Sequence, residues 1–204
     1  MLRNEQIGCG NLAHSLCSEY FAILKSMKYI YLVTGNAHKL KEWKQIVPND
    51  IKMDSADVDL AELQSDDVEE IVRDKARRAY EAVGKPVVVE DISAGLDMFE
   101  GLPGPFIKFF NKRLGGDALY QLAGRQEARA TVSCAVAYYD GSDTIVVRSA
   151  VHGKVVEPRV KEGFGFDITF VPDGETLTYA EMDAAQKNSL SHRSKAIRLL
   201  IEKL

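Results

Sequence analysis

The chain has 204 residues, of which 46% are hydrophobic and 27% are charged, and its formal net charge at pH 7 is -4. This length and composition fit one globular domain with a sizeable apolar core. They argue against a general nucleic-acid binder, which carries a strongly basic face, and no apolar run is long enough to cross a membrane. The three cysteines lack CxxC or zinc-site spacing and favour a reduced, cytoplasmic protein.

Residues 1–26 do not have the charged, apolar and small-residue regions of a secretory signal. Four apolar side chains in this segment have rough helical spacing, which permits a short amphipathic helix. Because the first clear strand begins at Met27, we expect residues 1–26 to be an extension that lies upstream of the functional start or was added in cloning. The folded domain is then expected over residues 27–204.

A strand is predicted over residues 27–33, followed at once by a polar turn and a helix through residues 40–47. The turn is Thr34-Gly35-Asn36-Ala37-His38-Lys39. Helix N-termini have unpaired N–H groups, and a glycine lets the backbone approach an anion closely, so phosphate is the expected ligand. Neither a Walker A loop nor a dinucleotide fingerprint is present. By itself, therefore, the turn also fits a simple helix cap.

The next elements are a short strand over residues 51–59, a long amphipathic helix over 68–83 that ends at Gly84, and a buried strand over 86–89. Glu90 and Asp91 follow, just before a segment rich in glycine and proline. In open α/β sheets ligands bind at the carboxyl ends of the strands, and Mg²⁺ takes one or two carboxylates. The pair therefore fits a metal-assisted site, with a solvated acidic turn as the alternative.

The second half predicts two short helices over residues 106–114 and 118–122, then strands over 129–139 and 144–154. The turn Asp140-Gly141-Ser142-Asp143 predicts that these strands form a hairpin. Ser191 is expected to cap a final helix. Parallel and antiparallel pairs together predict an α/β fold with a mixed sheet and flanking helices.

Six motifs occur along residues 27–204 in a fixed order. They are Thr34-Gly35-Asn36 with Lys39 and Glu42, the Glu90-Asp91 segment closed by Gly101-Leu102-Pro103-Gly104-Pro105, Phe164-Gly165-Phe166-Asp167, Ala180-Glu181-Met182, Lys187-Asn188 and Ser191-His192-Arg193. Together they resemble the inosine triphosphate pyrophosphatase family, also called Ham1 or RdgB-like. The resemblance implies an elongated fold with two lobes around a central substrate cleft, a homodimer, and Mg²⁺-dependent hydrolysis of ITP, dITP and XTP to the monophosphate and pyrophosphate, which cleanses the nucleotide pool.

The resemblance also implies roles for individual residues. Asp91 is the expected principal metal ligand and positions the attacking water, with Glu62 as the second metal ligand and Glu90 supporting the site from behind. The sequence around Glu62 departs from the family's usual glutamate followed by glycine. The residues expected to contact substrate are Thr34, Gly35, Asn36, Ala37, His38, Lys39, Lys75, Ile92, Lys108, Phe164, Gly165, Phe166, Asp167, Lys187, His192 and Arg193.

Base selection is assigned to the carboxyl-terminal motifs. Hypoxanthine and xanthine present an acceptor O6 where adenine presents a donor, so His192 and Arg193 as donors would favour the deaminated bases. Phe164 or Phe166 would supply a stacking face, although either could equally be a core aromatic residue. Asp167 would accept a hydrogen bond from the base or hold the pocket. Guanine also carries O6, and the sequence leaves its exclusion open.

Two alternatives are weighed. A pyrophosphatase of the Maf type would keep the chemistry and change the substrate to pyrimidine nucleotides, and the His192-Arg193 pair argues against it. A nucleotide-binding module without turnover is the second. The presence of both Glu62 and Asp91 favours catalysis.

Overall fold

The computed structural model describes residues 29–204, so the expected extension over residues 1–26 lies outside the described residues. In chain order the helices and strands are β1 (Tyr29–Val33), α2 (Ala37–Ile46), β2 (Lys52–Ala56), α3 (Val68–Val83), β3 (Val87–Leu96), β4 (Pro103–Gly104), α4 (Ile107–Leu114), α5 (Ala118–Leu122), β5 (Ala128–Tyr139), β6 (Thr144–Val155), β7 (Phe170–Pro172), α6 (Ala184–Leu190) and α7 (His192–Lys203). Two 3₁₀ turns, η1 (Asp97–Phe99) and η2 (Gly165–Ile168), complete the fold.

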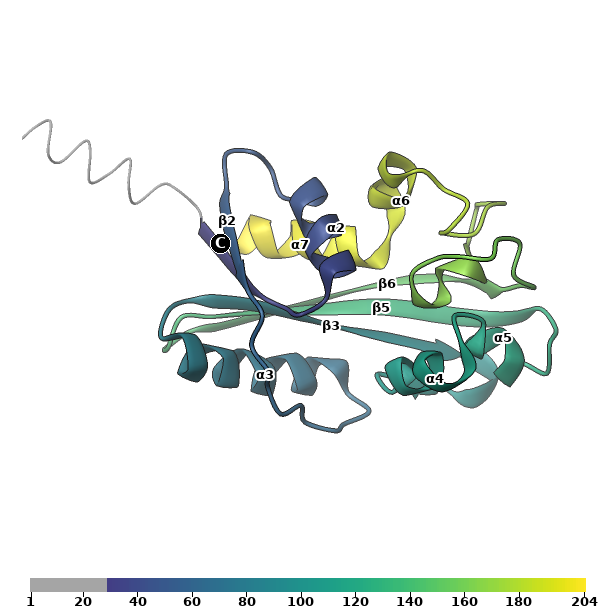
Figure 1. The fold of residues 1–204 in the computed structure, drawn as a ribbon, viewed down its shortest axis with the longest axis horizontal. Helices are drawn as coiled ribbons and strands as arrows, with labels where there is room; N and C mark the ends of the chain where they lie inside the picture. Colours follow the sequence, from purple (N-terminus) through teal and green to yellow (C-terminus); the bar gives the residue numbers. More distant parts are fainter. Residues whose placement is uncertain (1–28) are drawn as a thin grey trace, which may run out of the picture.

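The strands form one mixed sheet of seven strands in the order β2-β1-β3-β5-β6-β7, with β4 paired to β3. β1 pairs in parallel with β2 and with β3, whereas β3, β5, β6 and β7 form antiparallel pairs. The three long strands β3, β5 and β6 run along the length of the molecule and give it an elongated shape (Figure 1). The predicted α/β class with a mixed sheet is confirmed.

Helices cover both faces of this sheet (Figure 1). On one face α3 packs in an apolar cluster with Val87 and Val89, and on the other face α2 and α7 pack in a cluster with Val88. Successive residues of a strand point to opposite faces, so the continuous run of valines in β3 serves both layers. This arrangement explains why the strand has no polar alternation.

One expectation about β3 is wrong. The sequence predicts that the strand ends at Val89 and delivers Glu90 and Asp91 into a loop, but β3 continues to Leu96. The strand continues because β5 pairs with it antiparallel at every position from Val87 to Leu96. The two carboxylates therefore lie in the middle of a strand, where alternation directs Glu90 toward α2 and α7 and Asp91 toward the face of α3.

Asp91 still lies beside the carboxyl end of a strand, but that strand is β1. β1 pairs in parallel with β3 only at Leu32 and Val88, and it leaves the sheet after Val33. Asp91 lies three residues beyond that pair along β3. The carboxylate is therefore next to the carboxyl end of β1, although its own strand continues.

The predicted helix ends are confirmed. Gly84 adopts a left-handed conformation with φ 70° after α3, as expected for a helix-ending glycine, and the Ser191 side chain accepts a hydrogen bond from the Ser194 amide at the start of α7. The sequence patterns do not predict β4, β7 or α6. A strand of two or three residues is too short to show a hydrophobic period. No helix within residues 29–204 is long and apolar enough to cross a membrane.

Candidate active site

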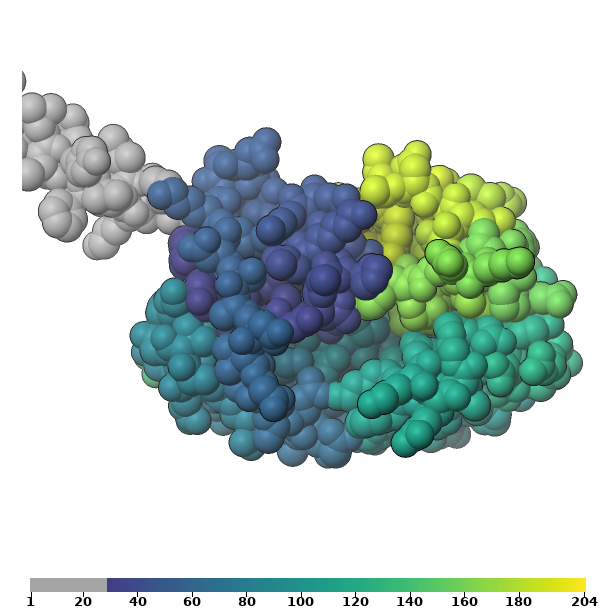
Figure 2. Space-filling model, in the orientation of Figure 1, coloured from purple at the N-terminus to yellow at the C-terminus, as the bar shows by residue number. Residues whose placement is uncertain are grey.

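A cleft with a volume of about 990 Å³ opens between the loops that follow β1 and β2, the face of α4 and the segment around η2. Figure 2 shows this face hollowed between the blue and purple atoms of the N-terminal part of the domain and the teal atoms of α4 and α5. The size suits a nucleotide, since small-molecule sites typically measure roughly 300–1,000 Å³. The predicted substrate residues that line it are Thr34, Gly35, Asn36, Lys39, Lys75, Ile92, Lys108, Phe164, Gly165, Phe166, Asp167, His192 and Arg193.

The turn between β1 and α2 forms one end of the cleft. Asn36 caps α2, because its Oδ1 accepts hydrogen bonds from the amides of His38, at 3.0 Å, and Lys39, at 3.2 Å. The cap satisfies these two amides, so they differ from the unpaired N–H groups that the sequence predicts for phosphate. A Cβ atom on Gly35 would lie 2.4 Å from the Asp57 carboxylate, so the Asp57 side chain would have to move to admit a larger residue. The Lys39 ammonium group and the backbone around Gly35 are therefore the parts of this turn that can contact an anion.

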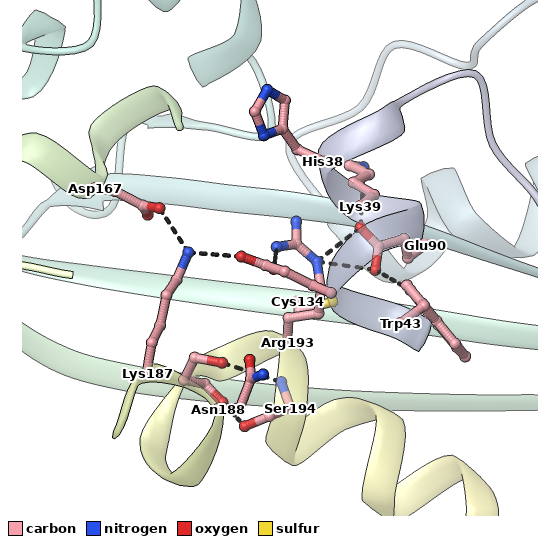
Figure 3. Close-up of polar contacts among 12 residues, drawn as sticks. His38, Lys39, Trp43, Glu90, Cys134, Asp167, Lys187, Asn188, Arg193 and Ser194 are labelled. Carbon is pink, nitrogen blue, oxygen red and sulfur yellow. Dashed lines mark hydrogen bonds and ion pairs between the residues drawn. The ribbon is translucent and has the colours of Figure 1, made fainter. Parts of the chain in front are cut away.

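Lys39 and Arg193 meet at Glu90 (Figure 3). The Lys39 Nζ lies 3.2 Å from one Glu90 oxygen, and the Trp43 Nε1 donates to the other at 2.7 Å. Burial alone would raise the pKa of Glu90, but Arg193, Lys39 and the Trp43 hydrogen bond outweigh it and hold the pKa at about 2. Glu90 is therefore ionised at neutral pH. It fixes Lys39 and Arg193, two cations that line the cleft.

A second buried group of charges adjoins the first. The Lys187 Nζ lies 2.6 Å from an Asp167 oxygen (Figure 3). It also lies 2.7 Å from a Glu42 oxygen, and Glu42 binds Arg193 as well. Burial raises the pKa of Asp167, even though Lys187 opposes the shift. These contacts connect α2 to η2, α6 and α7. They leave Lys187 occupied by protein carboxylates, and it does not line the cleft.

The predicted metal ligands Glu62 and Asp91 both line the cleft. Glu62 forms ion pairs with Lys75, at 2.8 Å, and with Lys108. Burial lowers the pKa of both lysines. The charges of three cations, Lys39, Lys75 and Lys108, therefore gather around two carboxylates, which is a suitable setting for a polyanion.

The donor set fits a hard divalent cation. Carboxylate oxygens are the ligands that Mg²⁺ or Ca²⁺ prefers. Among residues 29–204, no group of three or more His, Cys, Asp and Glu side chains is close enough to hold a metal ion alone. Glu62 and Asp91 would therefore share a metal with oxygens of the substrate, which is how Mg²⁺ is commonly bound beside phosphates.

The part of the cleft beside η2 is aromatic. Phe166 is buried in the apolar core, whereas Phe164 is half-buried and stacks on His38, with ring centroids 4.9 Å apart and an angle of 22° between the rings. Of the two phenylalanines, Phe164 is therefore the one that can offer a face to a base. Ala37 and His38 do not line the cleft, although His38 borders it through this stack.

His192 lies behind this aromatic part and is 3% exposed. Burial, together with the nearby charges of Arg193 and Lys187, holds its pKa well below 6.5, so the ring is neutral at pH 7. Its Nδ1 is buried and has no hydrogen-bond partner among the described residues. A neutral imidazole donates from one nitrogen and accepts at the other, so His192 has one buried polar atom available for a bound molecule.

Sequence reasoning missed several residues that line the cleft, namely Asp57, Asp59, Ile107, Asn111 and Lys112. The rule that ligands bind at strand carboxyl ends also applies to β2, and it would have identified the two aspartates. Helical spacing would have placed Lys112 beside Lys108. Trp43 also was not predicted to bind Glu90, although a buried indole N–H usually requires an acceptor.

The described fold agrees with comparisons to known proteins. The sequence model of the Ham1 family matches residues 30–203. The chain belongs to the Ham1 family. It is 41% identical to the inosine triphosphate pyrophosphatase of Puccinia graminis f. sp. tritici, covering 84% of this chain and 94% of that protein, and 42% identical to the enzyme of the same name from Tuber melanosporum, covering 85% and 95%.

Solved structures of Ham1 proteins share the fold. The Ham1 protein of Staphylococcus aureus superposes with a TM-score of 0.71 at 26% identity, covering 85% of this chain and 96% of that chain. A HAM1 protein from Coxiella burnetii gives a TM-score of 0.73 at 24% identity and the same coverage, which supports the fold alone. The Ham1 architecture therefore extends over almost all of the described residues.

Proposed function

We propose that this protein hydrolyses ITP, dITP and XTP to the nucleoside monophosphate and pyrophosphate, and so removes non-canonical purine nucleotides from the pool. One observation carries the proposal: a single cleft combines two carboxylates, several fixed cations and a half-buried phenylalanine ring. The triphosphate, the metal and the base each have a matching part of the cleft. The names of the fungal relatives give the same substrate class.

The residues that line the cleft have different roles in this reaction. Lys39, Lys75 and Lys108 offset the charge of the phosphates, including the negative charge that develops on the leaving pyrophosphate as its bond to the α-phosphorus breaks. Asp91 positions the attacking water. Glu62 and Asp91 would hold Mg²⁺, which supplies charge neutralisation and acidifies water.

The base would lie against Phe164, with His192 and Arg193 near its edge. A site whose donors pair with O6 rejects adenine, because adenine presents an amino donor at that position and the donors of the site are left buried and unpaired. This pairing favours a purine substrate over the pyrimidine nucleotides of the Maf type. The cation-rich cleft around Glu62 and Asp91 favours turnover over binding alone.

We also propose a homodimer in the cytoplasm. Met98, Phe99 and Leu102 are large apolar side chains that line a second hollow and are 58%, 41% and 52% exposed, and a second copy of the chain would cover them. Cys134 is a buried free thiol, which agrees with a reducing compartment. Light scattering after size exclusion tests the dimer directly.

The function is tested with a panel of ITP, dITP, XTP, ATP, GTP, UTP and CTP in Mg²⁺, with pyrophosphate and orthophosphate resolved. We expect pyrophosphate as the first product and the highest kcat/KM for ITP, dITP and XTP. The Asp91→Asn variant, purified in parallel, controls for contaminating phosphatases. Orthophosphate as the first product, or a pyrimidine triphosphate as the best substrate, would overturn the assignment.

A further inference from the structure

Asn111 is a polar residue of the cleft to which neither the motifs nor the proposed chemistry gives a role. It lies on α4 and lines the cleft. Its Oδ1 is shielded from solvent and has no hydrogen-bond partner among the described residues. A buried amide oxygen without a partner costs free energy. Such a group in a binding cleft suggests that a bound molecule completes its hydrogen bonding.

The position of Asn111 indicates which part of a nucleotide this is. Lys108 lies one turn earlier on the same face of α4 and pairs with Glu62, at the end of the cleft assigned to metal and phosphates. On its other side, the Nδ2 of Asn111 lies 3.2 Å from the point where a Cβ atom on Gly165 would stand. Gly165 separates Phe164 from Phe166 at the end assigned to the base.

Asn111 therefore lies between the phosphate end and the base end of the cleft. In a nucleoside triphosphate the ribose joins those two parts. A ribose hydroxyl both donates and accepts hydrogen bonds, and an asparagine amide offers both kinds of group. A hydroxyl can pair with either atom of the amide, so the hydrogen bond can form whichever way the Asn111 amide is flipped.

We propose that Asn111 binds a ribose hydroxyl of the substrate and is a specificity-determining residue of this enzyme. The proposal rests on the proposed function, because it uses the direction in which a nucleotide lies in the cleft. Its consequence is that discrimination among sugars depends on α4, whereas discrimination among bases depends on the segment of Phe164 and on α7.

The test compares the parent, Asn111→Leu and Arg113→Gln with three substrates. Leucine keeps a similar volume and removes both polar atoms, and Arg113 is an exposed residue of the same helix that does not line the cleft. The substrates are ITP, dITP and 2′,3′-dideoxy-ITP, which share one base and one triphosphate. For each combination of protein and substrate, kcat/KM is measured from pyrophosphate release, and the melting temperature of each protein is recorded.

We expect Asn111→Leu to lower kcat/KM about three- to tenfold for substrates that carry the bound hydroxyl, and to leave the others unchanged, because one neutral hydrogen bond is lost. A loss confined to ITP identifies the 2′-hydroxyl, and a loss for ITP and dITP but not for the dideoxy substrate identifies the 3′-hydroxyl. The melting temperature should stay or rise, because an unpaired buried oxygen is removed. Arg113→Gln should match the parent throughout.

Equal losses on all three substrates, or no loss on any, would overturn the role of Asn111. Such results are distinct from failure of the proposed function, because that failure would already appear as a parent enzyme that releases no pyrophosphate from ITP.

Discussion

The Nε of Arg193 lies 3.1 Å from both carboxylate oxygens of Glu90, and the two side chains are 2% and 1% exposed. This ion pair joins the first turn of α7 to the middle of β3. Trp43 of α2 donates to the same carboxylate. Arg193 lines the cleft and, through Glu90, also links α7 to β3 and α2. Substitutions of Arg193 therefore combine effects on catalysis and on folding.

Removal of Glu90 should destabilise the fold. Glu90→Ala leaves a buried guanidinium with one fewer counter-ion and a buried indole N–H without its acceptor, and loss of one partner of a buried pair typically costs about 3–5 kcal/mol. The free energy of unfolding in urea measures this loss. The matched control is Glu127→Ala, which breaks the surface pair with Lys154, at 2.7 Å, and should cost no more than about 1 kcal/mol. Equal losses for the two variants would contradict the inferred role of the buried pair.

The sequence predicted the members of the site better than their partners. Four of the six motifs contribute residues to the cleft lining, because the strand, turn and helix patterns around them are local. The motifs Ala180-Glu181-Met182 and Lys187-Asn188 do not line it. The pairing of Glu90 with Arg193, 103 positions apart, and that of Glu42 with Lys187, 145 positions apart, depend on how α7 and α6 pack beside α2. No local pattern encodes such contacts. They emerge only from the three-dimensional packing.

The extent of β3 shows the same limit. Glycine and two carboxylates in residues 90–96 have low strand propensity, and the sequence therefore predicted a loop. Pairing with β5 along the whole segment overrides that preference. Gly95 is also needed for space, because a Cβ atom there would lie 1.6 Å from the Gly101 carbonyl oxygen.

His192 should make the protein sensitive to mild acid. Its pKa is lower in the folded state than the ordinary 6.5, mainly through burial, so below pH 6.5 the unfolded chain binds a proton that the folded chain does not. Stability then falls as pH falls. Between pH 6.5 and 5.5 the contribution of one such group is about 1 kcal/mol.

This loss is measured by urea unfolding of the parent and of His192→Gln at both pH values. The other histidines are common to the two proteins, so the difference isolates His192. The variant should lose about 1 kcal/mol less than the parent over this interval. An identical loss in the two proteins would mean that His192 titrates normally in the folded state.

The metal site predicts different results for its two carboxylates. Asp91→Asn should remove most turnover while leaving the fold and much of the ITP affinity intact, since Asp91 is the proposed principal ligand and positions the water. Glu62→Gln should retain turnover but need roughly tenfold more Mg²⁺ for half-maximal rate, a change typical of weakened metal sites. Glu70→Gln is the control, because Glu70 bonds to Ser65 and does not line the cleft.

Near-parent turnover by Asp91→Asn in Mg²⁺ would remove Asp91 from the metal site. A Mg²⁺ dependence of Glu62→Gln that matches the parent would restrict Glu62 to holding Lys75 and Lys108.

Deletion of residues 1–26 should leave kcat/KM for ITP and the melting temperature unchanged. All matched motifs lie after Met27, and the family match begins at residue 30. Side-by-side assays of the full and shortened chains provide the measurement. A shortened chain that does not fold would show that the extension belongs to the domain.

Base selection is tested at His192, because Arg193 also holds Glu90 and Glu42 and its removal would disturb the fold. If the imidazole pairs with the hypoxanthine edge, His192→Phe should lower kcat/KM for ITP roughly 5- to 150-fold, which corresponds to a loss of about 1–3 kcal/mol in transition-state binding. The decrease in kcat/KM for ATP should be far smaller. Phenylalanine keeps an aromatic ring and its contacts with Phe166 and Tyr179.

Lys75→Ala is the contrasting variant, because it removes a charge from the phosphate end of the cleft. The values of kcat/KM for ITP and ATP should fall by the same factor, since their triphosphates are identical. An equal loss for ITP and ATP in His192→Phe would assign His192 to packing and leave base selection to other groups of the cleft.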